Sequence, residues 1–173
     1  GGGGGGVAAE EVLAGFEGLS AAPEEVRRCL EAIAGARQLR AFRPRALAGT
    51  ALAACAESPA KSEVLGWISE VLPDTDLTSA EPSDLAALAW SFAAACRGQA
   101  DDRALEAIAV QVAARAWEFS GDELAKTVQA FAELRVVHEE MLTAASWETM
   151  WKIDELSARG LSQMAVSLAQ LGF

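Results

Sequence analysis

The chain has 173 residues, 51% of them hydrophobic, and its 25 acidic residues against 14 basic ones leave a net charge of −11. This length and hydrophobic content exclude a wholly disordered chain, and the negative charge disfavours non-specific binding to nucleic acids because it repels phosphate. The longest apolar run without a charged residue is 85–96, which is too short to cross a bilayer. We therefore expect a soluble or peripherally attached protein.

The first part of the chain combines a glycine tail with two short amphipathic segments. Residues 1–7 begin with six glycines in place of an initiating Met, so we expect a flexible tail on a processed or truncated product. Apolar residues recur at helical spacing over 8–19 and 23–36, and Pro23 followed by two acids is a typical helix start. We interpret residues 8–43 as a degenerate first helix pair.

The remaining residues alternate between two kinds of predicted helix. Helices of the first kind are rich in alanine and begin with a leucine, whereas helices of the second kind are amphipathic. In the second kind, Trp117 is expected on the same inward face as Leu105, Ile108 and Val112. An acidic, turn-rich loop over 73–81 is the longest break. In chain order the helices are expected at 44–57, 59–72, 82–97, 101–119, 120–135, 137–153 and 157–171.

The leading leucines recur at a nearly constant distance. Leu85 follows Leu47 by 38 residues, Leu124 follows Leu85 by 39, and Leu161 follows Leu124 by 37. A period of this length, carried by helical spacing, is typical of stacked helix pairs. The sequence therefore predicts an all-α protein, an α-solenoid of helix-turn-helix repeats with a period of about 38 residues. The repeats are 44–81, 82–119 and 120–156, and a lone terminal helix follows over 157–173.

Several helix starts carry recognisable signals. Ser120 and Glu123 have the spacing of a capping box, in which each side chain accepts a hydrogen bond from the other's backbone amide. His138 is expected in a loop or at the cap of the helix that follows it. Hydrophobic residues that precede the next leading leucine by five positions are expected to staple the entering chain to that helix: they are Phe42, Phe119 and Leu156.

The sequence lacks the patterns typical of catalytic and metal sites. His138 is the only histidine, and the cysteines Cys29, Cys55 and Cys96 are far apart, whereas structural zinc needs closely spaced ligand pairs. A Ser–His–Asp set, a glycine-rich phosphate loop and an HExxH motif are also missing. We expect reduced cysteines, no metal, no cofactor and no enzymatic activity.

Three segments carry a family resemblance. The sequences FSGDELAKTVQAFAEL, PSDLAALAWSFAAA and LSARGLSQMAVSLAQLGF resemble the helical repeats of octotricopeptide-repeat and RAP-domain proteins, and FAST-kinase-like proteins carry related units. The resemblance covers residues 45–173. It implies a chloroplast or mitochondrial protein, and it implies RNA binding in transcript processing, stability or translation. No RAP domain is present, and the resemblance assigns no catalytic residue.

The one concentrated basic patch offers two interpretations. Arg37, Arg40, Arg43 and Arg45 lie in a stretch without acids. Guanidinium groups match phosphate oxygens, so these arginines are the candidate RNA contacts. The alternative is a solvated connector whose arginines pair with acids of adjacent repeats.

Tryptophan and leucine supply the candidate protein contacts. Five tryptophans occur without a single tyrosine. Trp90 lies two residues before Phe92, so the two side chains cannot share one helix face. The tryptophans serve as interface anchors, as surfaces on which nucleobases stack, or as core residues that fill space left by alanine. The terminal helix is expected to leave apolar surface uncovered. The candidate partner-binding residues are Trp90, Trp117, Trp147, Trp151, Leu168, Leu171 and Phe173.

These observations favour a non-catalytic interaction scaffold, a subunit or assembly partner of an organellar complex in the chloroplast or mitochondrion. Such a protein would bind protein subunits of a larger assembly and would reach a membrane only through a partner. The alternative is an organellar RNA-binding repeat protein.

Overall fold

The computed structural model describes residues 39–57, 61–95 and 102–173, and every regular element within these ranges is helical. The all-α prediction is confirmed for this part of the chain, whereas the expected helices at 8–19 and 23–36 lie outside it. None of the described helices is long and apolar enough to span a membrane. The α-helices are α4 (Pro44–Glu57), α5 (Lys61–Val71), α6 (Pro82–Ala95), α7 (Asp102–Arg115), α8 (Gly121–Leu134), α9 (Glu139–Trp151) and α10 (Ala158–Leu171).

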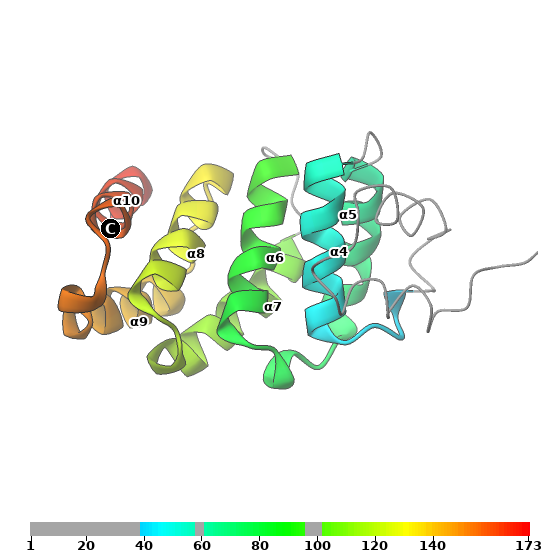
Figure 1. The fold of residues 1–173 in the computed structure, drawn as a ribbon, viewed down its shortest axis with the longest axis horizontal. Coiled ribbons are helices and arrows are strands. Elements are labelled where there is room, and N and C mark those ends of the chain that lie inside the picture. The colour runs from blue at the N-terminus through cyan, green and yellow to red at the C-terminus, as the bar shows by residue number, and fades with distance from the viewer. Residues whose placement is uncertain (1–38, 58–60, 96–101) are drawn as a thin grey trace, which may run out of the picture.

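The helices form two layers (Figure 1). One layer is a row in which α4 packs against α6, α6 against α8, and α8 against α10. The other layer contains α5, α7 and α9, and α7 packs against α9. Each helix of the row also contacts the helix that follows it, in the pairs α4–α5, α6–α7 and α8–α9. Within the described residues, α10 packs chiefly against α8 and has no such mate.

Short 3₁₀ turns connect the two layers where longer helices or loops are expected from sequence. They are η1 (Leu72–Asp74), η2 (Leu77–Ser79), η3 (Ala116–Glu118) and η4 (Ile153–Glu155). The helix expected to reach 119 ends at Arg115, whose backbone leaves the helical region at φ −133° and ψ 23°. The predicted inward position of Trp117 is therefore wrong: its side chain is 65% exposed.

Polar side chains fix the starts of the last three α-helices. The capping box is confirmed, since Ser120 Oγ accepts from Glu123 N at 3.3 Å and Glu123 Oε2 accepts from Ser120 N at 2.9 Å. His138 is the N-cap of α9, where its Nδ1 accepts from Met141 N at 3.1 Å. Ser157 caps α10 in the same manner. Each contact satisfies an amide that the first helical turn leaves unpaired.

The core follows the repeated register of the first layer. The leading leucines of α4, α6 and α8 are all fully buried. The position three residues after each leading leucine is also buried in all four helices, and it holds Thr50, Leu88, Thr127 and Met164. The two threonine hydroxyls donate to the carbonyls of Ala46 and Glu123, at 2.7 and 2.9 Å, so no polar atom is left unpaired there. Small residues on the same faces allow neighbouring helices to approach closely.

Two of the three predicted staples are buried and the third is half-buried. Phe42 and Phe119 are 4% and 1% exposed. Leu156 is half-buried and lies over the first turn of α8, where a Cβ on Gly121 would meet its side chain. A side chain at 121 would therefore displace Leu156, which lies in the chain that leads into α10.

Candidate interaction surfaces

Three tryptophans of the C-terminal half point into solvent. Trp147 and Trp151 are four residues apart on α9 and are 59% and 81% exposed, and Trp117 follows α7 in η3. The i, i+4 spacing places the two α9 side chains on one helix face. We call Trp117, Trp147 and Trp151 the tryptophan surface. Filling of the core, one interpretation of these residues, is wrong for all three.

The helix that presents this surface is tied to α7 at its start. His138, besides capping α9, brings its Nε2 to 3.5 Å from Oε1 of Glu106 on α7. The pair becomes ionic when the ring is protonated. This contact between α9 and α7 lies outside the tryptophan surface itself.

The other end of α9 is held by a lysine. Lys152 Nζ donates to the carbonyls of Trp117 and Phe119 at 2.8 and 2.7 Å. Glu148 lies one turn earlier, with an oxygen 3.5 Å from the same nitrogen. Because the lysine bonds to the backbone of Trp117, it connects the η3 turn to the end of the helix that carries Trp151.

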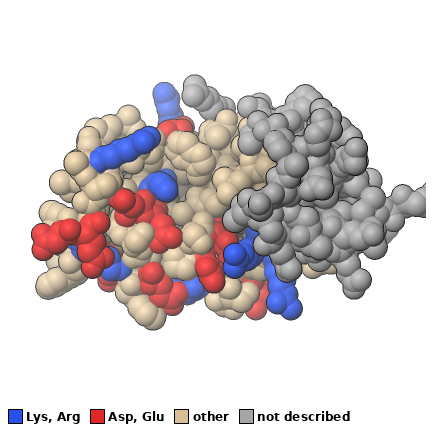
Figure 2. Space-filling view, in the orientation of Figure 1, with Lys and Arg blue, Asp and Glu red and all other residues tan. Residues whose placement is uncertain are grey.

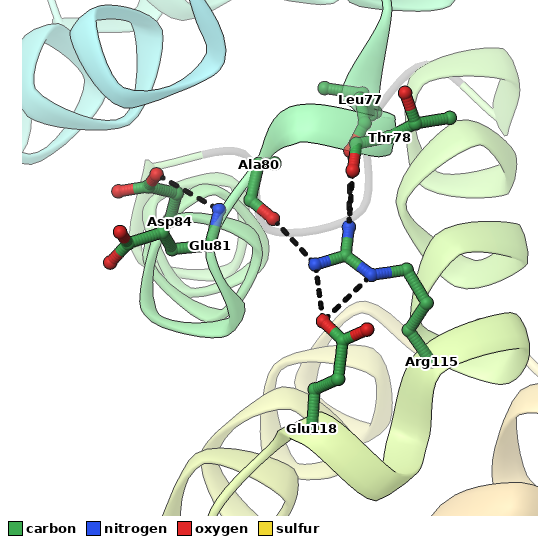
Figure 3. Close-up of polar contacts among 7 residues, drawn as sticks. All are labelled: Leu77, Thr78, Ala80, Glu81, Asp84, Arg115 and Glu118. Carbon is green, nitrogen blue, oxygen red and sulfur yellow. Dashed lines mark hydrogen bonds and ion pairs between the residues drawn. The ribbon is translucent and has the colours of Figure 1, made fainter.

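Arg115 makes a similar set of bonds at the end of α7 (Figure 3). Its guanidinium donates to the carbonyls of Thr78 and Ala80, both at 2.9 Å. Nε of the same group donates to Glu118 Oε2 at 2.9 Å. This bond raises the pKa of Arg115 and lowers the pKa of Glu118 from their ordinary values. We call Arg115 and Lys152 the carbonyl clamps.

A groove crosses the row of first-layer helices. Its volume is about 450 Å³, and Trp90, 38% exposed, lines it together with Leu52. Lys126 and Arg159 line the same groove, and neither makes a hydrogen bond or ion pair in the described part of the chain. Phe92 is 1% exposed, so Trp90 and Phe92 do point to different faces. The groove combines apolar contact with two unpaired positive charges.

The structure describes three of the four arginines of the predicted basic patch. Arg37 lies outside the described residues. Arg40 Nη2 is 4.0 Å from Asp74 Oδ2, and both side chains are more than half exposed. Arg43 and Arg45 are exposed. Arg40 and Arg43 border a depression of about 590 Å³ that Asp74 and Asp76 also line, so acids share the surface with these arginines.

The charges on the visible face are mixed rather than sorted. Figure 2 shows separate basic groups interspersed with acidic ones, and the acidic groups extend from the α9 end across the middle of the face. Over the described residues that are visible in this view, basic groups do not form a continuous path along the row. Among the described residues, no group of three or more His, Cys, Asp or Glu side chains has the arrangement of a metal site.

The terminal helix leaves part of its apolar surface uncovered. Leu168 and Leu171 are half-buried against the core, and Phe173 is 51% exposed. Leu161 and Val166 of α10 are 45% and 53% exposed. The structure thus brings Leu161 to the surface, although its counterpart Leu124 is fully buried.

Sequence reasoning did not single out Arg115, Lys152, Lys126 or Arg159. A signal exists for the first two, because Lys152 follows Arg115 by 37 residues, which is the distance between the leading leucines of α8 and α10. No sequence signal distinguishes Lys126 or Arg159 from other surface cations.

A scan against protein-family models found no match, and a search among curated proteins found none either.

Proposed function

We propose that this chain is a non-catalytic interaction scaffold, an α-solenoid of helix pairs with a period of about 38 residues. Its role is that of a subunit or assembly partner of an organellar complex, in the chloroplast or mitochondrion. The observation that carries the proposal is the tryptophan surface: three large aromatic side chains, 59–81% exposed, on elements that polar contacts hold in place. Tryptophan anchors of this kind dominate binding energy when a partner's pocket covers them.

The two layers explain how such a scaffold would present its anchors. The row buries the leading leucines of α4, α6 and α8, whereas the second layer carries several exposed apolar side chains. Val110 on α7 and Trp147 on α9 are both exposed and lie 37 residues apart. Equivalent positions of successive units therefore face outward together, as extended binding surfaces of repeat proteins require.

RNA binding is the second candidate, and the groove favours it. Trp90 would stack on a base, while Lys126 and Arg159 would contact phosphates. Against this stands the acidic net charge of −11, and for this reason we rank the protein scaffold first.

The proposal is tested with a triple variant, Trp117→Ser, Trp147→Ser and Trp151→Ser. Immobilised wild-type chain and variant are incubated with chloroplast and mitochondrial extracts, and bound proteins are quantified by mass spectrometry. We expect a stoichiometric partner that the wild type retains and the triple variant loses. The matched control is Leu52→Ser, Val137→Ser and Val166→Ser, which also removes three exposed apolar side chains but should keep the partner.

The same preparation separates the two candidates. RNA binding predicts an electrophoretic shift that weakens steeply with salt, with a salt slope reduced by about 1.4 when Lys126→Ala and Arg159→Ala are combined, since each single-strand phosphate contact contributes about 0.7. A shift of this kind, together with no partner that depends on the tryptophans, would reverse our ranking.

A further inference from the structure

The groove over the first layer is built from the same positions of successive helices. It extends from Leu52 on α4 to Arg159 on α10. Two of its lining positions follow the leading leucines by two and by five residues; they hold Ala87, Lys126 and Gln163, and Leu52, Trp90 and Gln129. Because α6 and α8 each pack against a first-layer neighbour on both sides and still expose Trp90 and Lys126, the groove does not depend on an open end of the row.

The chemistry of the groove changes along its length. Leu52 and Trp90, each 38% exposed, make one end apolar. The other end carries two acids and two bases whose formal charges cancel: Asp122, Glu123, Lys126 and Arg159. The groove therefore joins an apolar surface to a polar one without a net charge.

The two carboxylates of the polar end already accept hydrogen bonds. Oδ1 of Asp122 accepts from N and Oγ of Ser157, at 3.3 and 2.9 Å. Oε2 of Glu123 accepts from N and Oγ of Ser120, at 2.9 and 2.8 Å. The ammonium and guanidinium groups of the groove have no such contact within the described residues. The charged groups left without a hydrogen bond are therefore both donors.

Cations of this chain already bind backbone carbonyls elsewhere. Arg115 donates to the carbonyl of Ala80 at 2.9 Å, and Lys152 donates to the carbonyl of Phe119 at 2.7 Å. Ala80 has φ/ψ of −69°/138° and Phe119 has φ/ψ of −76°/145°, which are polyproline II values. The carbonyl clamps thus show how an ammonium or guanidinium group of this protein holds an extended backbone. The unpaired cations of the groove carry the same two groups.

The spacing of the helices matches a polyproline II repeat. Packed helices lie about 8–10 Å apart, and a polyproline II chain advances about 9 Å in each turn of three residues. Every third side chain of such a chain therefore meets the next helix of the row. Proline favours this conformation and lacks a backbone N–H, so a proline-rich segment presents carbonyl acceptors with few competing donors. Such a segment complements a groove whose unpaired charged groups are donors.

Charge decides between this segment and RNA. A nucleic acid brings a negative charge with each nucleotide, whereas the groove has no net charge to offset it and the whole chain carries −11. The backbone of a proline-rich segment is uncharged and meets no such repulsion. Grooves lined by aromatic side chains, as Trp90 lines this one, are a recurring mode of polyproline II recognition.

We propose that the groove binds a proline-rich segment of a partner protein in the polyproline II conformation. Its apolar side chains pack on Leu52 and Trp90, and its backbone carbonyls accept hydrogen bonds from Lys126 and Arg159. The inference rests on the proposed scaffold function and names a second partner, bound on the layer opposite the tryptophan surface.

The probe is a capped fluorescent peptide with the sequence Pro-Pro-Leu repeated three times. Its nine residues span about 28 Å as polyproline II, close to the distance from α4 to α10 in a row of helices about 8–10 Å apart. A second peptide of the same composition has its three leucines together at one end, and so it loses the three-residue register. Fluorescence anisotropy with the whole chain measures the binding of both peptides.

We expect the first peptide to bind saturably and the second to bind more weakly. Trp90→Ser should weaken binding of the first peptide roughly tenfold, because it removes the aromatic anchor. Lys126→Ala combined with Arg159→Ala should weaken it by a similar factor, through the loss of hydrogen bonds from charged donors. The matched control combines Arg40→Ala with Arg43→Ala, which removes two exposed cations outside the groove and should leave binding unchanged.

Three results would overturn the inference in variants whose circular dichroism spectra are unchanged. They are equal effects of the two double variants, equal binding of the two peptides, and no saturable binding of the first peptide to the wild type. A nine-nucleotide oligouridylate tests the other occupant. If this RNA displaces the peptide and its own binding is lost in the combined Lys126→Ala and Arg159→Ala variant, the groove belongs to RNA and the inference falls.

The groove and the tryptophan surface are tested independently. The triple tryptophan variant should still bind the peptide, and loss of binding in that variant would assign the peptide to the tryptophan surface and overturn the inference. The variant with Leu52→Ser, Val137→Ser and Val166→Ser should do the reverse, because it keeps the tryptophan-dependent partner but binds the peptide more weakly. If the peptide fails while partner capture still depends on the tryptophans, the groove inference falls and the scaffold function stands.

Discussion

Replacing Arg115 by alanine removes a connection between α7 and the η2 turn, two segments that lie far apart in the sequence. The guanidinium bonds at 2.9 Å to the carbonyls of Thr78 and Ala80 are lost together with the pairing to Glu118. A hydrogen bond to a charged group contributes about 1.5–3 kcal/mol net. The side chain is 19% exposed, so water can partly replace the donor at the freed carbonyls. We therefore expect Arg115→Ala to lower the free energy of unfolding by about 2–3 kcal/mol.

Urea unfolding, followed by circular dichroism and tryptophan fluorescence, measures this change. Arg115→Lys keeps a positive charge but lacks the forked geometry, and it should recover about half of the lost stability. Lys126→Ala is the matched control, because Lys126 is an exposed cation without a partner in the described residues. It should change the free energy of unfolding by less than about 0.5 kcal/mol.

The reasoning would be refuted if Arg115→Ala and Lys126→Ala had equal effects. That result would mean that burial of leucine and alanine alone holds the η2 turn against α7, and that the carbonyl bonds only replace equally good bonds to water.

The structure also predicts how four other substitutions should affect the free energy of unfolding. Gly160→Ala should lower the free energy of unfolding by about 1–3 kcal/mol in urea titrations. The reason is that the added Cβ would collide with Asp122, whose carboxylate accepts hydrogen bonds from Ser157. An equal loss in Gly66→Ala, where the space around the added Cβ is open, would contradict this. His138→Ala should cost about 1 kcal/mol through loss of the α9 cap, while His138→Asn should restore most of it. Trp151→Ser should change stability by less than about 0.5 kcal/mol, because the side chain is 81% exposed. The hydrogen bond from Arg115 lowers the pKa of Glu118 below its usual 4.5. The stabilising effect of this bond is therefore complete when the pH is above the usual pKa, and it is lost as the pH falls through the lowered pKa. The free energies of unfolding of the wild type and of Glu118→Gln should converge in acid.

The sequence predicted the features that depend on neighbouring residues. The capping box of Ser120 and Glu123 needs only the spacing of a first helical turn, so local pattern was sufficient. For His138 the same reasoning left two alternatives, a loop or a helix cap. The leading leucines mark buried positions in α4, α6 and α8 because helical spacing fixes which face they share. In α10 the same pattern gave Leu161, which is exposed, since burial also requires a neighbouring helix that the pattern does not contain.

The end of α7 could not be predicted in this way. The residues around Ala116 favour a continued helix by propensity, yet the chain turns at Arg115, where the clamp bonds to carbonyls 35–37 residues earlier in the chain. The turn rotates Trp117 from the expected core face into solvent. A contact between segments that are distant in the sequence thus determines where Trp117 lies. Such a contact cannot be deduced from the residues that neighbour Trp117 in the chain.

The carbonyl clamps also fix the register of alanine-rich helices, which packing alone would leave poorly defined. Alanine methyl groups pack closely but are nearly interchangeable, so sliding one helix against another by a turn changes the buried area little. Directional hydrogen bonds lack this ambiguity, because a guanidinium or ammonium group reaches a pair of carbonyls at only one register. Arg115 sets that register between α7 and the η2 turn, and Lys152 sets it between α9 and the η3 turn. Leu85 and Leu124 supply the burial. For this reason the positions of the exposed tryptophans depend on two cations that lie outside the tryptophan surface.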